Sequence, residues 1–390
     1  MAIEPRGTGA DAPAYAHLGR FSDWVARSPA PARRAVVRPA AELRRLVHEA
    51  LDVPADPADE AAADVRTGRT WERDGVVGQE VSWSAGFGPR TEAWLLRPAG
   101  VDGPLPGVLA LHGHDGFKAL GKEKVADGPD GPAPVVEALR RGLYGGRAIA
   151  DDLARAGFTV LVHDTFTWGS RRFELDEMPD RLAAAGRATS ASSSPDDVPG
   201  DVPPDVALLN AAAWHHEHLV EKYCRLLGTT FAAQVAREDR LALAVLRARP
   251  DVGAVGSVGL SGGGARSVLL RATADVDATV VVGMMSTYEA LLDHSVVDHT
   301  WMLFPEGLAG TVDWPDVAAS GAPAPLLVQW TRDDPLFPVE GARAAHERLA
   351  SAYAAAGAAD AHTGEEHDGP HWFGPAMQGS ATAWLRRHLT

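Results

Sequence analysis

The chain has one cysteine among its 390 residues, Cys224, so it cannot form an intramolecular disulfide. Positive charge is also scarce: 37 Lys and Arg residues stand against 52 Asp and Glu, which gives a formal net charge of −15. Nucleic acids and anionic membranes attract positive surfaces, so this balance argues against both as partners. No apolar run is long enough to span a bilayer, and the first residues lack the apolar core of a signal peptide. We therefore expect a cytoplasmic protein.

Length and composition are those of a globular protein with a large core. Hydrophobic residues make up 45% of the chain and charged residues 23%, which suits one large domain with additions. The chain contains only 5 tyrosines but 11 tryptophans. Tryptophans in loops are typical of pocket walls that receive a sugar ring or an apolar acyl group.

The most informative motif is the pentapeptide Gly259-Leu260-Ser261-Gly262-Gly263. The residues before it predict a short buried strand, and those after it predict the start of a helix. A serine on such a tight turn adopts strained backbone geometry and exposes its hydroxyl at the carboxyl edge of a sheet. Glycines before and after it are needed because the turn leaves no room for side chains. We therefore predict that Ser261 is a nucleophile.

A serine nucleophile needs a base and a carboxylate that orients the base. A predicted buried strand ends just before Asp333 and Asp334, and a proline-bearing turn follows. Asp334 is the preferred orienting carboxylate, with Asp333 as the alternative. The base is expected last in the chain, and His371 lies at the junction between a loop and the C-terminal helix. His367 is the competing base.

Donors for the oxyanion are predicted in two loops. The buried strand at residues 106–111 ends in His112-Gly113-His114-Asp115-Gly116, a loop that can present a backbone N–H to a developing negative charge. By position His114 supplies this donor through its backbone. The second donor is the N–H of Gly262, directly after the nucleophile.

Two other patterns resemble ligand motifs but lack a required feature. Residues 116–123 match a phosphate-binding loop until the last position, where Glu123 replaces the Ser or Thr that binds magnesium. His215, His216 and His218 are adjacent or nearly so, without the spacing that places two zinc ligands on one helix face. We expect neither a nucleotide, nor a metal, nor another cofactor.

Strand and helix patterns alternate along most of the chain. An antiparallel edge pair is predicted first, followed by alternating strands and helices that predict a mostly parallel central sheet with helices on both faces. The expected strands are 76–83, 91–98, 107–112, 158–163, 254–260, 277–284, 325–330 and 359–363. The expected helices are 15–26, 40–51, 145–156, 262–273, 339–356 and 376–389.

Two regions lie outside this regular pattern. We expect residues 1–74 to form an N-terminal helical extension and residues 75–390 to form the main domain, with an insertion at about 174–250. Within the insertion, residues 186–204 predict a mobile loop. Residues 206–249 predict one long or two consecutive helices, which either pack in the core or form a lid over the serine.

These motifs together resemble the α/β-hydrolase superfamily, and within it the branch of dienelactone hydrolases and acetyl xylan esterases. The resemblance covers roughly residues 75–390. It rests on residues 111–116, 121–124, 144–147, 162–164 and 169–171, the serine pentapeptide, residues 334–338 and His371. It implies an α/β-hydrolase fold and a Ser261–His371–Asp334 triad acting on a carboxylic ester.

The sequence therefore predicts a serine hydrolase of small-molecule esters, as a monomer or a homo-oligomer. An amidase, a peptidase or a carbon–carbon bond hydrolase with the same triad, and a non-catalytic ligand-binding protein, remain alternatives. Trp168 and Trp372 are predicted to line the substrate pocket. Arg171 and Arg172 either clamp a substrate carboxylate or pair with acids such as Glu174.

Overall fold

A nine-stranded sheet forms the centre of the molecule. The computed structural model describes residues 15, 17–54, 61–192, 202–292 and 296–390. Within these residues the strand order is β1-β2-β3-β5-β4-β6-β7-β8-β9. The strands are β1 (Ala63–Arg73), β2 (Val76–Ser84), β3 (Thr91–Pro98), β4 (Leu105–Leu111), β5 (Thr159–His163), β6 (Val252–Leu260), β7 (Ala278–Val282), β8 (Leu326–Thr331) and β9 (His362–His367).

The order of the strands reverses beside β4. Strands β1, β2 and β3 are antiparallel neighbours, and β3 pairs antiparallel with β5. From β5 onward every pair is parallel. Strand β4 lies between β5, which follows it in sequence, and β6, so the chain leaves β4 and β6 in opposite directions across the sheet. Such a reversal opens a crevice at the carboxyl ends of the strands, where ligands bind in open α/β sheets.

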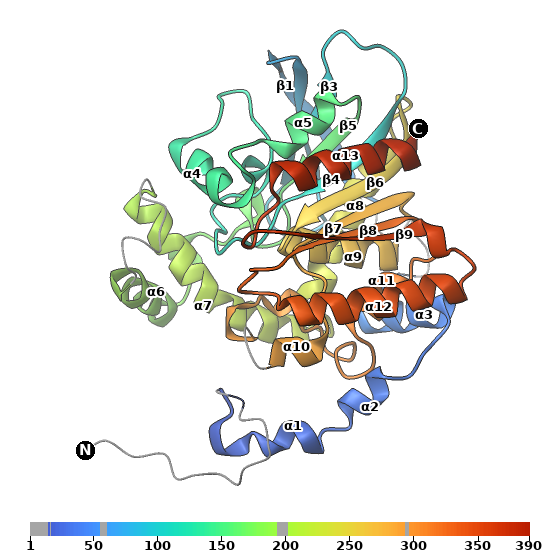
Figure 1. Cartoon of the computed structure of the whole chain (residues 1–390). Coiled ribbons are helices and arrows are strands. Elements are labelled where there is room, and N and C mark those ends of the chain that lie inside the picture. Colours follow the sequence, from blue (N-terminus) through green and yellow to red (C-terminus); the bar gives the residue numbers. More distant parts are fainter. Residues whose placement is uncertain (1–14, 16, 55–60, 193–201, 293–295) are drawn as a thin grey trace.

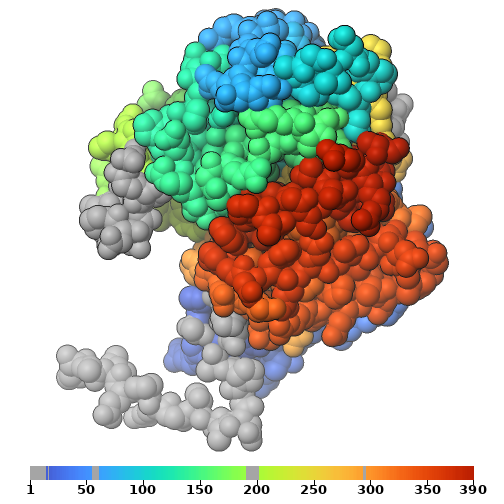
Figure 2. All heavy atoms as spheres, turned by 45° about the horizontal axis from the view of Figure 1, so that its top comes forward, coloured from blue at the N-terminus to red at the C-terminus, as the bar shows by residue number. Residues whose placement is uncertain are grey.

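Helices cover both faces of the sheet (Figure 1). One face is covered by α4 (Pro134–Leu143), α5 (Ile149–Arg155) and α13 (Pro375–Leu389). The other is covered by α3 (Ala40–Ala50), α8 (Phe231–Arg247), α9 (Gly262–Thr273), α11 (Trp314–Ala319) and α12 (Val339–Ala355). Figure 2 shows α13, in red, lying across the surface between the blue and cyan N-terminal strands and the orange-red residues of the α12 region.

The central strands are buried on both faces because each face meets a helix layer. In β4, Val108 and Ala110 belong to the core under α4, α5 and α13, while Leu109 and Leu111 belong to the core under α8 and α9. This alternation follows from the two-residue period of a strand. It explains why the sequence of β4 is continuously apolar and not alternating.

The remaining helices lie at the periphery of the sheet. They are α1 (Asp23–Arg27), α2 (Ala30–Arg34), α6 (Asp180–Ser192), α7 (Pro204–Leu226) and α10 (Tyr288–Leu292). Helices α6 and α7 pack on each other and project to one side of the sheet (Figure 1). In the described part of the chain, no helix has the length and apolar character needed to cross a membrane.

The structure agrees with the predicted mostly parallel sheet and its two helix layers and differs at several elements. Strand β1 occupies residues 63–73, inside the segment expected to be a helical extension, and pairs with β2. Its residues are mostly exposed, so it lacks the apolar alternation that marks a strand. The predicted helix 15–26 is reduced to a short turn and α1, and β9 begins three residues later than expected.

Helix α4, which precedes the insertion, was not predicted. The insertion also differs in detail from its prediction. Helix α6 reaches Ser192, within the segment expected to be a mobile loop, and residues 193–201 of that segment lie outside the described residues. The segment 206–249 forms two helices, α7 and α8. Most of α8 is buried against α9, as the packing alternative requires.

A buried acid in α5 gives the fold a pH dependence that can be measured. Asp151 is 2% exposed, and its carboxylate accepts the N–H of Asp127 at 2.9 Å. Burial raises the pKa of Asp151 to about 6, from an ordinary value of 3.8. Because the folded pKa lies above the unfolded one, ionising Asp151 costs stability that grows as the pH rises from about 4 to 6.

We predict that Asp151→Asn stabilises the protein by on the order of 2–3 kcal/mol at pH 8, since the amide can still accept the Asp127 N–H and carries no charge. The gain should vanish near pH 3.5, where the wild-type carboxyl is protonated in both states. Urea unfolding at the two pH values measures this. The neighbour Asp152, whose partners Arg147 and Arg155 are partly exposed, supplies the control Asp152→Asn. An equal gain at both pH values would contradict the explanation.

Candidate active site

Ser261 lies on the tight turn between β6 and α9, at the carboxyl edge of the sheet. Its φ of 55° and ψ of −119° fall outside the regions that non-glycine residues normally adopt. The Ser261 N–H donates to Val282 O at 2.8 Å, which ties the turn to the end of β7. A strained residue that its neighbours hold in place is typical of an active site, and this geometry is that of a nucleophile elbow.

The glycines around the serine allow backbone to pack on backbone. A Cβ on Gly259 would lie 2.3 Å from Gly263 C, and a Cβ on Gly263 would lie 2.1 Å from Leu111 O. Leu111 is the last residue of β4 and pairs with Gly259 in the sheet. The turn therefore closes against the end of β4 at a distance that no side chain permits.

The side chains of His371 and Asp334 meet in a hydrogen bond. His371 Nδ1 lies 2.7 Å from Asp334 Oδ2. The other carboxylate oxygen accepts the N–H groups of Leu336 and Phe337 at 2.8 and 3.0 Å. The Phe337 ring stacks on the imidazole with centroids 5.9 Å apart. Asp334 is thus held in one orientation and in turn orients the His371 ring.

The imidazole lies next to the serine turn. Its Cε1 is 3.4 Å from the position that a Cβ would occupy on Gly283. Gly283 directly follows Val282, whose carbonyl accepts the Ser261 N–H. Residues from three distant parts of the chain therefore meet at the ends of β6, β7 and β8.

The competing residues lie elsewhere. Asp333 is exposed, and its backbone N–H donates to Gly369 O at 3.2 Å. His367 ends β9 and has its Nε2 3.3 Å from Glu365 Oε2. Neither residue enters the His371–Asp334 pair. The geometry therefore favours Asp334 over Asp333 as the orienting carboxylate and His371 over His367 as the base.

The proposed oxyanion donors lie side by side. A Cβ on Gly262 would lie 2.7 Å from the backbone nitrogen of His114. Gly262 opens α9, where the first N–H groups of a helix have no partner within the helix. In the described residues the His114 N–H donates to no other backbone or side-chain group. Two N–H groups are therefore available next to Ser261, and the partial positive charge of the α9 N-terminus adds to them.

The His114 side chain is used to hold its own loop. Its Nδ1 accepts the N–H of Gly116 at 3.0 Å, and its Nε2 lies 3.4 Å from Glu217 Oε2. The ring packs edge-on against Trp168 and Trp214, at 5.2 and 5.5 Å between centroids. Burial lowers the pKa of His114 below its usual value, although Glu217 acts in the opposite direction.

Glu217 joins the insertion to this loop, a role that no pattern in the sequence indicates. Its Oε2 lies 2.5 Å from Lys118 Nζ, and its Oε1 accepts the Thr300 hydroxyl at 2.6 Å and the Trp301 N–H at 2.9 Å. Burial alone would raise its pKa, but Lys118 and His114 hold it far below the usual range. Helix α7 therefore contacts the His114 loop through Glu217, and a role of this helix as a lid over the serine stays a prediction.

His299 is a further residue near the pair that sequence reasoning did not find. Its ring packs on Phe337 with centroids 4.7 Å apart, and the same Phe337 ring stacks on His371. Its Nε2 donates to Leu336 O at 3.2 Å. Burial lowers the pKa of His299 to about 4, so at neutral pH the ring is uncharged.

Two of the predicted substrate-binding residues, Arg171 and Trp168, bind other parts of the protein with their polar groups. Arg171 is 4% exposed, and its guanidinium pairs with Glu238 and donates to the carbonyls of Phe87 and Pro89. This favours structural pairing over a substrate clamp, with Glu238 as the partner. Trp168 is 2% exposed, and its Nε1 donates to His114 O at 3.4 Å. Trp168 therefore packs against residues 112–116, the loop that contains the proposed oxyanion donor His114 and is called the oxyanion loop below.

Trp372, the third of them, is half-buried and packs against its own loop. Its ring atoms lie 2.8 Å from the positions that Cβ atoms would take on Gly369 and Gly374. The neighbouring Arg172 is partnered too, since its Nη2 lies 2.7 Å from Glu174 Oε1. For Arg172 this favours pairing with an acid over a substrate clamp, and the acid is the predicted Glu174. The role of Trp372 in lining a substrate pocket stays a prediction.

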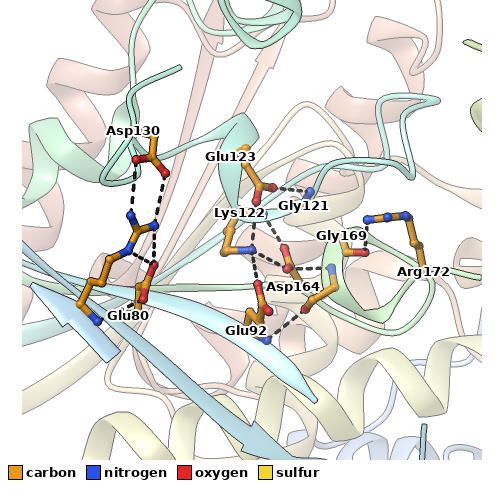
Figure 3. A network of polar contacts seen from close by, with 11 residues as sticks. Glu80, Glu92, Gly121, Lys122, Glu123, Asp130, Asp164, Gly169 and Arg172 are labelled. Atoms are coloured by element: carbon orange, nitrogen blue, oxygen red, sulfur yellow. Dashed lines mark hydrogen bonds and ion pairs between the residues drawn. The ribbon is translucent and has the colours of Figure 1, made fainter. Parts of the chain in front are cut away.

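Lys122, at the lysine position of the phosphate-loop pattern, belongs to a protein network instead (Figure 3). Its ammonium lies 2.8 Å from Asp164 Oδ2 and 2.9 Å from Glu123 Oε1. Asp164 also accepts the backbone N–H groups of Lys122 and Ser170. Burial would raise the pKa of Asp164, but Lys122 and these donors hold it below the usual value. The network ties the loop after β4 to the loop after β5.

A buried cluster of His163, Asp239 and Arg266 contains a second His–Asp pair. His163 Nε2 and Asp239 Oδ1 are 2.9 Å apart, and Arg266 Nη2 lies 2.6 Å from the same oxygen. All three side chains are inaccessible to solvent, so this pair cannot serve a substrate. Arg266 also donates to His112 O at 3.1 Å and thereby anchors the start of the oxyanion loop. No cluster of residues in the described chain has the arrangement of a metal site.

Sheet order, elbow and His–Asp pair together define an α/β-hydrolase fold, and solved structures share it. A glucuronoyl esterase from Solibacter usitatus superposes with a TM-score of 0.58 at 13% identity, covering 89% of this chain and 92% of its own. An acetyl xylan esterase from Paenibacillus sp. R4 gives a TM-score of 0.56 at 14% identity, covering 93% and 99% respectively.

A curated protein resembles the chain in sequence as well. "Putative hydrolase YtaP" of Bacillus subtilis (strain 168) is 22% identical over 338 residues, which are 86% of this chain and 95% of the relative. No protein-family model matches the chain. The fold agrees with the resemblance that the sequence motifs indicated.

We predict that Gly262→Ala lowers kcat by roughly 100-fold, the scale of losing one oxyanion donor. The added methyl would displace the His114 N–H, while the helical backbone at position 262 accepts alanine. Ester turnover and thermal unfolding measure the two effects. Gly379→Ala on α13 is the matched control, because its Cβ meets nothing within 4 Å. Equal activity of the two variants would refute the placement of the oxyanion hole.

Proposed function

We propose that the protein is a serine hydrolase that cleaves a carboxylic ester of a small molecule through an acyl-enzyme on Ser261. The observation that carries this proposal is the His371–Asp334 pair at 2.7 Å beside a serine held at φ 55°. Two adjacent backbone N–H groups complete the requirements of acyl transfer.

Each group has one task in the proposed reaction. His371 removes the hydroxyl proton of Ser261 as the oxygen attacks the ester carbonyl. The N–H groups of His114 and Gly262 bind the tetrahedral oxyanion, and Asp334 fixes the imidazole tautomer and stabilises its charged form. His371 then protonates the leaving alcohol, which leaves an acyl-serine.

The second half of the reaction reverses these roles. Water enters as the alcohol leaves, and His371 takes its proton while the water oxygen attacks the acyl carbon. The same two N–H groups bind the second oxyanion, and collapse of the intermediate returns the proton to Ser261 and releases the acid. No cofactor is required for either half.

Three lines support ester hydrolysis as the reaction class. Solved structures with this fold are named as esterases of acetyl xylan and of glucuronoyl esters. The related Bacillus subtilis protein is named as a hydrolase. The half-buried Trp214, which packs on the His114 ring, suits a sugar or an apolar group. A cytoplasmic location stays a prediction from the sequence, and so do the two alternatives of a monomer and a homo-oligomer.

We predict that Ser261→Ala lowers kcat on p-nitrophenyl esters by about 10⁴-fold or more with the fold intact. A panel of acyl chain lengths, with a p-nitroanilide included, separates an esterase from an amidase. Labelling with a fluorophosphonate checks the nucleophile, since wild-type protein should form an adduct at position 261 and the variant should not.

His371→Gln should reduce turnover on the same scale, because among the described histidines His371 is the one that hydrogen-bonds to Asp334 beside the serine turn. His367→Gln is its matched control and should retain near wild-type activity, since His367 contacts Glu365 and lies outside the pair. If Ser261→Ala still hydrolysed the esters at the wild-type rate, or if loss of His367 alone abolished turnover, the proposed site would be wrong.

A further inference from the structure

The lysines of this chain are concentrated behind the oxyanion loop. The sequence contains only four lysines, and three of them are Lys118, Lys122 and Lys124. All three side chains are buried, with 4%, 6% and 0% exposed. Each is paired with a carboxylate, which offsets the cost of burying its charge.

Lys124 differs from the other two in what its ammonium binds. Nζ donates to Gly113 O and to His114 O, both at 2.9 Å, and lies 3.2 Å from Asp115 Oδ2. Lys118 and Lys122 bind side chains of Glu217, Thr167, Asp164 and Glu123. Only Lys124 of the three directly binds the backbone of the loop that ends β4.

The Gly113 carbonyl and the His114 N–H belong to the same peptide group. In a trans peptide these two bonds point in opposite directions. An ammonium that fixes the carbonyl on one side therefore aims the N–H to the other, toward the position beside Gly262. Hydrogen bonds in such a chain also polarise one another, which makes the N–H a stronger donor.

The next carbonyl along the loop is held as well, so the loop cannot turn over. His114 O accepts from Lys124 and from the indole of Trp168. A Cβ on Gly113 would lie 2.3 Å from Asp115 Oδ1, because the Asp115 carboxylate folds back over Gly113 to reach the ammonium. Asp115 adopts a positive φ of 56° to do so. Burial lowers the pKa of Lys124, and Asp115 counteracts this.

We propose that Lys124 is a positioning residue for the oxyanion hole: its ammonium fixes and polarises the Gly113–His114 peptide so that the His114 N–H binds the developing negative charge. The inference rests on the proposed ester hydrolysis. Lys124 does not touch the substrate, and it acts through the backbone alone.

The test compares p-nitrophenyl acetate with its thionoester, in which sulfur replaces the carbonyl oxygen that would enter the oxyanion hole. Sulfur is a weak hydrogen-bond acceptor, so a working hole favours the oxygen ester. We predict that Lys124→Met lowers kcat on the oxygen ester by roughly 10- to 100-fold with little change in KM. The ester ratio, defined as kcat/KM for the oxygen ester divided by kcat/KM for the thionoester, should fall by about ten-fold.

This ratio is unaffected by a loss of folded protein, because both rates scale with the same active fraction. Arg271→Met is the matched control. Arg271 is another buried cation that donates to backbone carbonyls, those of Ala318, Ala324 and Pro325, at the far end of α9. Its replacement should lower the unfolding temperature and leave the ester ratio unchanged.

A second set of variants separates the ammonium from its counter-charge. Asp115→Asn keeps the Lys124 ammonium on the two carbonyls. The ester ratio of this variant should therefore stay close to that of the wild-type protein. The double variant Lys124→Met with Asp115→Asn leaves no unpaired buried charge, and it carries the test if the single lysine variant does not fold. In the double variant the ratio should fall as in Lys124→Met.

An unchanged ratio in a folded Lys124 variant, with wild-type protein active on the oxygen ester, would overturn this inference and leave the proposed function standing. Wild-type protein inactive on all esters and unlabelled by the fluorophosphonate would overturn both.

Discussion

The contact between the β6–α9 turn and the end of β4 is the constraint on which the rest of the site depends. These two parallel strands are neighbours only because the strand order reverses at β4. Gly259 and Gly263 let their backbones approach to a distance that excludes any Cβ. That approach holds Ser261 in its strained conformation and brings the N–H of His114 beside Gly262. The conformation of Ser261 and the position of the two N–H groups proposed as oxyanion donors are therefore consequences of one packing arrangement and not of separate local motifs.

Buried ion pairs hold the loops that this packing brings together. Arg266 and Lys124 bind consecutive carbonyls at the end of β4, and each is balanced by a carboxylate, Asp239 and Asp115 respectively. Removing one partner of such a pair leaves an uncompensated charge in a medium of low dielectric constant, which is costly. The pairs therefore act together, and the loop has few alternative arrangements. The Lys124, Asp115, Arg266 and Asp239 side chains are almost completely buried, so their charges interact more strongly with the loop backbone than they would in solvent.

The insertion takes part in the site as well as in the core. Helix α8 supplies Asp239 and Glu238, the partners of Arg266 and Arg171, and α7 supplies Glu217, the partner of Lys118. Patterns in the sequence predicted helices over residues 206–249, and could not predict the role of their acids. Nothing in the sequence near Glu217 distinguishes it from a solvated helix residue. Strand β1 was missed for a related reason, because its mostly exposed residues lack an apolar alternation and it is defined by its hydrogen bonds to β2.

The sequence alone determined the layered α/β fold and the positions where its chemistry would lie. Short apolar runs, turn glycines and helical periodicity are local properties, so the strand–turn–helix unit at Ser261 and the loops at His114, Asp334 and His371 could be found without coordinates. The tertiary structure decided which of several candidates meet. The side chains of Asp334 and His371 contact each other, whereas His367 contacts Glu365 and Asp333 takes no part in the contact. The structure therefore favours Asp334 over Asp333 and His371 over His367. It also assigned Arg171 and Trp168 to the support of the loops. Partners in a hydrogen bond are chosen by distances across the sheet, and residues far apart in the chain carry no local sign of that choice.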